Sequence, residues 1–113
     1  MESEYPIYPK AHDLILWLTQ RTLHFPKSQR FVLARRVQDA ALGFYTLLIE
    51  ARKVERVERS RVLLQADVLL ERLRLELRLC HELRLLSTDQ YGYVSKMVVE
   101  VGKLLGSWRR GNR

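Results

Sequence analysis

The residues best suited to chemistry in this sequence are arginines along one predicted helix. Arg74 and Arg78 are one helical turn apart, and His81 continues the same strip. A row of cationic donors at this spacing suits phosphate groups, because each neutralised phosphate releases counterions and adds affinity that salt removes. The alternative is a solvated face on which these arginines pair with acidic neighbours, namely Glu71, Asp67 and Glu82.

Other basic residues extend this candidate surface. They lie on the second predicted helix, on the charged connection after it and at the C-terminal end: Arg35, Arg36, Arg56, Arg59, Arg61, Arg109, Arg110 and Arg113. The sequence has 20 Lys and Arg against 13 Asp and Glu, a net charge of +7, and the excess lies in residues 21–65 and 101–113. Such a field attracts polyanions, so nucleic acid is the expected partner, with an ordinary basic surface as the alternative.

No set of residues predicts an enzyme or a metal site. His12, His24 and His81 fall on different predicted helices or helix ends, without the Glu-x-x-His spacing by which bundles hold metals. Cys80 lies on a predicted core stripe, where a buried, inert thiol is expected. Several carboxylates are predicted to be helix-surface partners of nearby arginines: Asp39, Glu50, Glu71 and Glu76. We therefore expect a non-enzymatic protein with no metal and no cofactor.

The sequence also predicts a location. One cysteine cannot form an intramolecular disulfide, and residues 1–4 lack the basic and apolar pattern of a signal peptide. Charged residues interrupt every leucine-rich stretch before it reaches the roughly 20 apolar residues that cross a bilayer. These features predict a cytoplasmic protein that does not interact with a membrane.

The spacing of apolar residues predicts four helices in a single domain spanning residues 1–113. The expected ranges are about residues 9–24, 28–52, 58–86 and 88–110. Pro26 separates the first two helices, Ser28 is the expected N-cap of the second, and Ser87 with Gln90 forms a capping box before the fourth. Helices of this length with short connections predict an all-α, antiparallel up-down four-helix bundle.

The third predicted helix carries two apolar faces, whereas a monomeric bundle buries one. A face nearly opposite its core stripe consists of Leu64, Val68, Leu75, Leu79 and Leu86. This second face predicts self-association, and the alternative is that the long connection before this helix or the N-terminal segment, with Tyr5, Ile7 and Tyr8, folds back to cover it. Gly102 and Gly106, both costly inside a helix, predict the close approach of another backbone within the bundle or across a subunit contact.

Four motifs in the sequence resemble one protein family. They are Glu100-Val101-Gly102-Lys103-Leu104-Leu105-Gly106-Ser107-Trp108, Leu73-Arg74-x-x-Leu77-Arg78, Ala66-Asp67 and Phe25-Pro26-Lys27. Together they resemble the accessory variability determinant (Avd) proteins of diversity-generating retroelements, over about residues 9–108. The break at Phe25-Pro26-Lys27 is also similar to bundle proteins related to the S23 ribosomal intervening-sequence family.

The Avd resemblance implies a non-enzymatic four-helix bundle that assembles into a homopentameric, positively charged barrel. It implies binding to a reverse transcriptase and to nucleic acid, both template RNA and complementary DNA, in support of mutagenic cDNA synthesis and retrohoming. The basic residues that it implies as binding candidates are Arg74 and Arg78. The expected setting is the cytoplasm of a bacterial or phage-infected bacterial cell. The alternative is an S23-like bundle that binds structured RNA or a protein partner without a reverse transcriptase.

Overall fold

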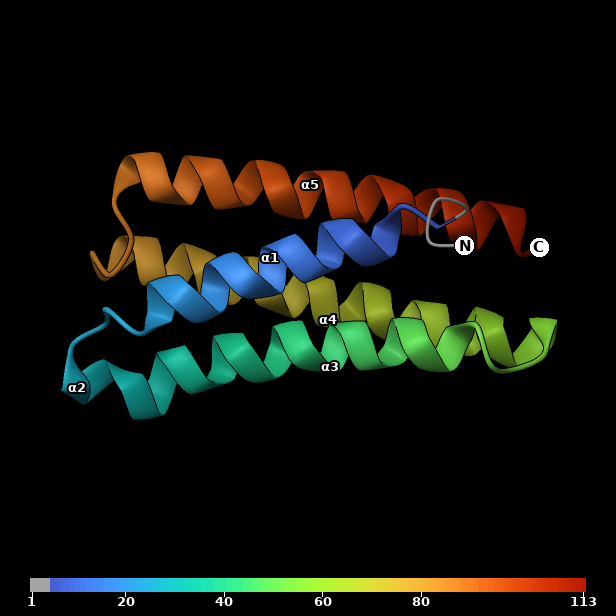
Figure 1. The fold of residues 1–113 in the computed structure, drawn as a ribbon, viewed down its shortest axis with the longest axis horizontal. Helices are drawn as coiled ribbons and strands as arrows, with labels where there is room; N and C mark the ends of the chain where they lie inside the picture. The colour runs from blue at the N-terminus through green and yellow to red at the C-terminus, as the bar shows by residue number, and fades with distance from the viewer. Residues whose placement is uncertain (1–4) are drawn as a thin grey trace.

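The computed structural model describes residues 5–113, with the backbone alone at residues 29–31. The regular elements in this part of the chain are all helical. In chain order they are α1 (Ile7–Thr22), α2 (Lys27–Gln29), the π-helical segment η2 (Arg30–Ala34), α3 (Arg35–Ala51), α4 (Arg56–Glu82) and α5 (Thr88–Gly111). Because α2, η2 and α3 follow one another without a break, the chain forms four helical rods (Figure 1).

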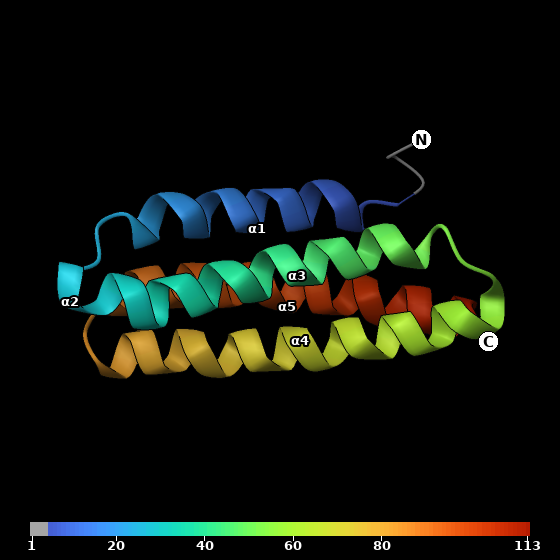
Figure 2. The same cartoon turned by 90° about the horizontal axis from the view of Figure 1, so that it is seen from below.

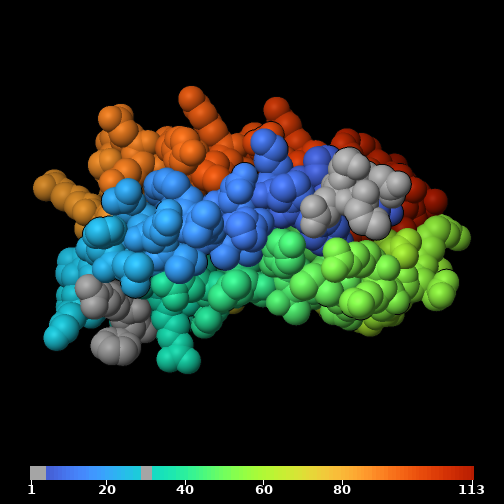
Figure 3. All heavy atoms as spheres, in the orientation of Figure 1, coloured from blue at the N-terminus to red at the C-terminus, as the bar shows by residue number. Residues whose placement is uncertain are grey.

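The four rods form an antiparallel bundle. The chain reverses direction at each connection, and the rods are aligned along the 43 Å long axis of the molecule (Figures 1 and 2). Each rod contacts two others, since α1 packs against α3 and α5, and α4 packs against the same two helices. Figure 3 shows α1 filling the space between α3 and α5 on one side. The predicted all-α, up-down bundle is confirmed.

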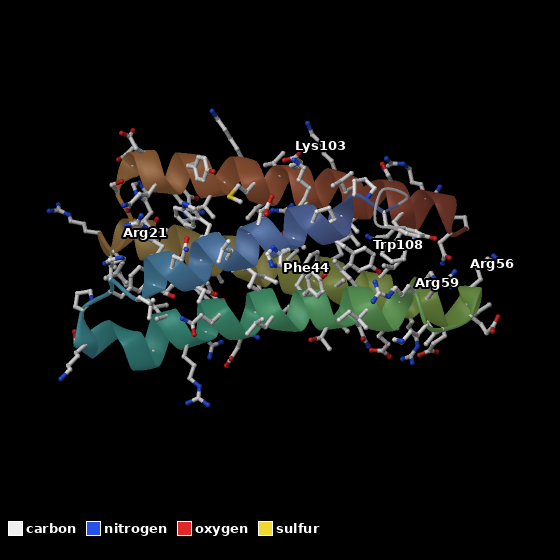
Figure 4. All side chains as sticks on the ribbon, in the orientation of Figure 1. Arg21, Phe44, Arg56, Arg59, Lys103 and Trp108 are labelled. Carbon is white, nitrogen blue, oxygen red and sulfur yellow. The ribbon has the colours of Figure 1, made fainter. Side chains whose placement is uncertain are left out.

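The core runs along the bundle axis and is built from one apolar stripe of each rod. Phe44 lies near its middle (Figure 4). The large side chains that are almost completely buried include Leu14, Leu18, Phe44, Leu48, Leu63, Leu70, Leu73, Val94 and Leu105. Burying such a side chain contributes about 1.5–3 kcal/mol each, so these stripes dominate the stability of the bundle.

The first helix begins two residues before the predicted range and ends two residues before its predicted end. Pro6 and Pro9 both fall at its start, where the backbone N–H groups have no helical partner and proline is tolerated. Tyr8 is buried, and its hydroxyl donates to the carbonyl oxygen of Leu48 at 2.7 Å. The ring of Tyr5 lies 5.5 Å from that of Trp108 on α5. The N-terminal segment therefore packs against α3 and α5, and the alternative that it covers α4 is wrong.

The second rod begins earlier than predicted. Ser28 was expected as its N-cap, but it lies inside α2, which starts at Lys27 directly after Pro26. The cap prediction is therefore wrong. The physical reason is that proline disfavours the helical conformation only at the residue before it, so the helix can begin immediately after Pro26.

The third helix is shifted toward the N-terminus relative to its predicted range of 58–86. It starts at Arg56 and ends at Glu82, because Arg84 adopts the left-handed conformation (φ 64°) that terminates helices. The amides of Leu85 and Leu86 then donate to the carbonyl oxygen of Cys80, at 2.8 and 3.3 Å. Leu86 turns inward and is 2% exposed. The prediction that Leu86 belongs to the second apolar face is therefore wrong.

The fourth rod matches its prediction closely. The Ser87 side chain accepts a hydrogen bond from the Gln90 amide at 3.1 Å, and the Gln90 side chain accepts one from the Ser87 amide at 2.9 Å. This reciprocal arrangement confirms the predicted capping box. It sets the start of α5 at Thr88 and thereby the register of α5 along α4.

Candidate nucleic-acid interface

Four arginines, Arg74, Arg109, Arg110 and Arg113, line the surface where α4 and α5 meet, a strip that we call the α4–α5 groove. On α4 the strip follows positions three and four residues apart, and on α5 it follows small residues. Its α4 side consists of Ser60, Leu63, Asp67, Arg74 and Leu77, and its α5 side consists of Ser95, Val98, Gly102, Gly106 and Arg109. A pocket of about 120 Å³ lies beside Tyr91, and one of about 290 Å³ lies at the opposite end.

Arg74 lies at the middle of this groove. Its guanidinium donates to Glu71 at 2.9 Å and rests against Gly102, where an added Cβ would lie 2.6 Å from the Nη2 atom. Within the single chain, the close approach at Gly102 is therefore made by an arginine side chain. Glycine at position 102 leaves the room in which the Arg74 guanidinium reaches α5.

Arg78 and His81, the other two residues of the predicted strip on α4, lie in different environments. Arg78 is exposed, and its Nε atom donates to Glu82 at 3.2 Å. The ring of His81 stacks on Tyr91 at 4.6 Å with only 6° between the planes, so His81 contacts α5. Glu71 and Glu82 pair with α4 arginines, as the alternative predicted, but Asp67 pairs with Arg109 across the groove at 3.2 Å.

Three C-terminal arginines line the larger pocket together with residues of α4. They are Arg109, Arg110 and Arg113, and the lining also includes Ser60, Leu63, Gly106 and Asn112. Arg110 donates to the Ser107 hydroxyl at 3.2 Å, and an added Cβ at Gly106 would lie 3.3 Å from its Nη1 atom. The structure thus brings Arg74, Arg109 and Arg110 to one groove.

Arg59 has a structural position at the same end of the bundle (Figure 4). Its guanidinium donates to the carbonyl oxygens of Ala51 and Val54, both at 2.6 Å, and to the Asn112 side chain at 3.2 Å. Arg59 therefore ties the α3–α4 connection to the end of α5. Arg61 is exposed, and its hydrogen bond with Glu58 at 2.7 Å raises its pKa.

Arg35 and Arg36 lie on α3, away from the groove. Arg35 is 3.9 Å from Asp39, whereas Arg36 is 3.4 Å from Glu76, which also accepts from Arg72 at 2.8 Å. Glu76 is only 3% exposed, and its Oε1 atom has no hydrogen-bond partner in the part of the chain described. The prediction that Glu76 is a surface residue is therefore wrong, because α3 packs over it.

The second apolar face of α4 is exposed in the single chain. We call it the outer α4 face, and it consists of Leu64, Val68, Leu75 and Leu79, which are 48, 62, 56 and 37% exposed. The sequence correctly placed these residues away from the core. Whether another subunit covers them, or contacts Gly102 and Gly106, remains a prediction.

An aromatic cluster at the start of α1 escaped the sequence analysis. Tyr5, Tyr8 and Trp108 have ring centroids within 6.2 Å of one another. Trp108 lies about one hundred positions after the two tyrosines in the sequence, so no local pattern predicts the cluster. Ser60 and Asn112 were missed for the same reason, since only the packing of α4 against α5 places them beside the arginines.

Cys80 is the one cysteine, and it is buried in the core. Burial, with a smaller contribution from Glu76, raises its pKa to about 11, which leaves almost no reactive thiolate at neutral pH. Among residues 5–113, no group of three or more His, Cys, Asp or Glu side chains is placed to hold a metal ion. In the same range, no helix is long and apolar enough to cross a membrane.

Comparison with known proteins identifies the family. No curated protein matches the sequence, but the model of the bAvd-like family matches residues 7–111, from the start of α1 to the end of α5. The chain belongs to the bAvd-like family. The match confirms the Avd resemblance found from the motifs. The bAvd-like family is a family of accessory proteins and not a known enzyme family.

Proposed function

We propose that this bAvd-like chain is a non-enzymatic accessory factor of a diversity-generating retroelement. It binds the reverse transcriptase of the element together with template RNA and cDNA, and it supports mutagenic cDNA synthesis and retrohoming. The observation that carries the proposal is the α4–α5 groove, in which Arg74, Arg109 and Arg110 gather on a chain whose family match spans all four rods.

The mechanism that this surface supports is positioning. Arginines bind phosphate groups and fix the register of a nucleic acid, but phosphate contacts carry no base sequence. The groove residues named above offer many guanidinium donors and few groups that would read a base edge. The factor would therefore hold template and polymerase together with little sequence preference, and the chemistry would remain with the reverse transcriptase.

Self-association of the chain would provide several copies of this nucleic-acid-binding groove. The outer α4 face supplies an exposed apolar surface for self-association, and symmetric copies would repeat the basic groove around the assembly. A homopentameric barrel is the assembly that the family resemblance implies. Such a particle would act in the cytoplasm of the bacterial or phage-infected cell that contains the retroelement.

Co-purification with the reverse transcriptase of the same element tests the proposal. We expect the wild-type chain to retain the reverse transcriptase and the Arg74→Glu/Arg78→Glu variant to lose most of it. Lys96→Glu/Lys103→Glu is the matched control, because it makes the same charge change on α5, where Lys103 points away from the bundle (Figure 4).

Three outcomes separate the possibilities. Loss in the arginine variant but not in the lysine control supports the proposed site. Full retention by the folded arginine variant removes Arg74 and Arg78 from the site. No reverse transcriptase with the wild-type chain overturns the proposed function and favours the S23-like alternative.

A further inference from the structure

We infer that the larger pocket of the α4–α5 groove is a binding site for one phosphate group. We call it the arginine pocket, and it is lined by Ser60, Leu63, Gly106, Arg109, Arg110, Asn112 and Arg113. The inference deepens the proposed function and rests on it for the source of the phosphate, which is a nucleic acid.

The chemistry of the lining suits a tetrahedral oxyanion. The pocket has a volume of about 290 Å³, and its lining residues carry three guanidinium groups, one carboxamide and one hydroxyl. Guanidinium groups present several N–H donors in a fixed plane and bind phosphate oxygens in pairs. No aspartate or glutamate is among the lining residues, so an entering anion meets donors and positive charge.

The charges of the pocket are not fully neutralised by the protein itself. Arg109 pairs with Asp67 at 3.2 Å, at the edge of the pocket. Within residues 5–113, no carboxylate lies within 4.0 Å of a guanidinium nitrogen of Arg110 or Arg113. In the described part of the chain, the Arg110 guanidinium donates to the neutral Ser107 hydroxyl and pairs with no carboxylate, which leaves its positive charge available to a ligand.

The surrounding structure fixes the shape of the pocket. Asn112 accepts from Arg59 at 3.2 Å and donates to the carbonyl oxygen of Arg56 at 3.0 Å, so the end of α5 is tied to the start of α4. Gly106 forms part of the lining without a side chain, and a Cβ there would approach Arg110 to 3.3 Å. A site whose walls are already in place loses little entropy when a ligand enters.

The position of the pocket relates it to Arg74. Gly102, against which Arg74 rests, and Gly106, which lines the pocket, are four residues apart on α5, or roughly 6 Å along the helix axis. A strand that follows the groove would therefore present neighbouring phosphates to Arg74 and to the arginine pocket. The phosphate in the pocket is then either an internal phosphodiester or the terminal phosphate of a strand.

Two measurements on the full chain test the inference. The first follows the Gly106 amide and the arginine Nε–H signals by NMR during titration with inorganic phosphate, at constant ionic strength against chloride. The second measures the affinity of a single-stranded oligonucleotide with and without a 5′-phosphate. Both compare the wild-type chain with Arg110→Gln/Arg113→Gln and with Lys96→Gln/Lys103→Gln, which removes the same charge from exposed positions of α5.

The expected result is a saturable phosphate shift at Gly106 and Arg110 that the lysine control keeps and the arginine variant loses. The comparison between the two variants is made at the Gly106 amide, because Arg110→Gln removes the Arg110 signal itself. For the oligonucleotide, we expect the arginine variant to lose about tenfold more affinity than the control does. A loss confined to the 5′-phosphorylated strand identifies the terminal phosphate as the ligand. An equal loss for both strands identifies an internal phosphodiester.

The contrary results are equally distinct. Absence of a saturable phosphate shift, or equal losses in the two variants, overturns the arginine pocket. If the wild-type chain binds oligonucleotide while the arginine variant binds it equally well, the pocket inference fails and the proposed nucleic-acid binding stands. If phosphate binds but no oligonucleotide does, the pocket stands and the proposed nucleic-acid binding fails.

Discussion

Arginines that look equivalent in the sequence have different partners in the structure, and the partner decides what each can do. Arg36 neutralises the buried Glu76, Arg59 binds backbone carbonyls, and Arg110 donates to a neutral hydroxyl. The sequence predicts that all of them are basic and helical. It does not predict which are structural, because partners such as Asn112 for Arg59 and Glu76 for Arg36 are distant in the sequence.

Replacing Arg59 separates a structural arginine from a surface one. Arg59→Ala leaves the carbonyls of Ala51 and Val54 without their donor, so we expect a loss of about 2–3 kcal/mol in the free energy of unfolding. Arg61→Ala is the control, because its ion pair with Glu58 is exposed to solvent and contributes little to stability. Urea denaturation measures both values, and equal losses would contradict the structural role of Arg59.

The alkylation rate of the Cys80 thiol tests whether this side chain is buried in the core. Its pKa of about 11 lies above the ordinary value of 9.0, so the folded state favours the protonated thiol. Its contribution to stability is complete below pH 9 and is lost as the pH rises through about 11. At pH 8 we expect iodoacetamide to alkylate the native chain about a hundredfold more slowly than the urea-unfolded chain. Similar rates for the two states would contradict the burial of Cys80.

At the scale of the helices, periodicity predicts which elements exist and which face each one buries. The capping box of α5 was predictable because both partners are three residues apart. The end of α4 was not, since its last turn depends on a left-handed Arg84 and on the burial of Leu86 by other helices. The sequence around Arg84 does not predict its left-handed conformation, because the residue that ends a helix in this way is usually glycine.

Alanine substitutions at two glycines of α5 separate the effect of helix propensity on stability from the effect of packing. Gly92→Ala adds a methyl group with nothing within 4 Å, so we expect it to raise the free energy of unfolding by about 0.5–1 kcal/mol. Gly102→Ala has the same propensity gain, but its Cβ displaces the Arg74 guanidinium from the groove. We therefore expect a smaller gain in urea denaturation and weaker binding of nucleic acid. Equal gains in stability would show that Arg74 does not depend on Gly102.

At the scale of the whole molecule, one surface that includes α4 could be predicted from the sequence and another could not. The outer α4 face follows from the spacing of Leu64, Val68, Leu75 and Leu79 within one helix. The arginine pocket does not, because it combines the start of α4 with the end of α5. The sequence indicates the basic character of Arg109, Arg110 and Arg113, but only the packing of the bundle places Ser60 and Leu63 of α4 beside them.

The outer α4 face is where we expect charged substitutions to dissociate an assembly. Val68→Glu with Leu75→Glu places two charges on this face, and we expect the assembly to dissociate into single folded chains, because a buried unpaired carboxylate is costly. Leu16→Glu with Leu42→Glu is the control, since these leucines are 48 and 53% exposed on other helices. Sedimentation velocity compares the two variants. Dissociation of both, or of neither, would contradict the assignment of this face.

The light-scattering mass of the purified chain on a sizing column, with the 260/280 nm absorbance ratio recorded at low and high salt, is the most direct test of the proposed assembly and its nucleic-acid partner. A basic pentameric accessory factor predicts a mass of five 13.4 kDa chains. It also predicts nucleic acid bound at low salt and released at high salt, because phosphate contacts weaken as salt rises. A species of 13.4 kDa without nucleic acid at either salt concentration would contradict both the assembly and the proposed partner.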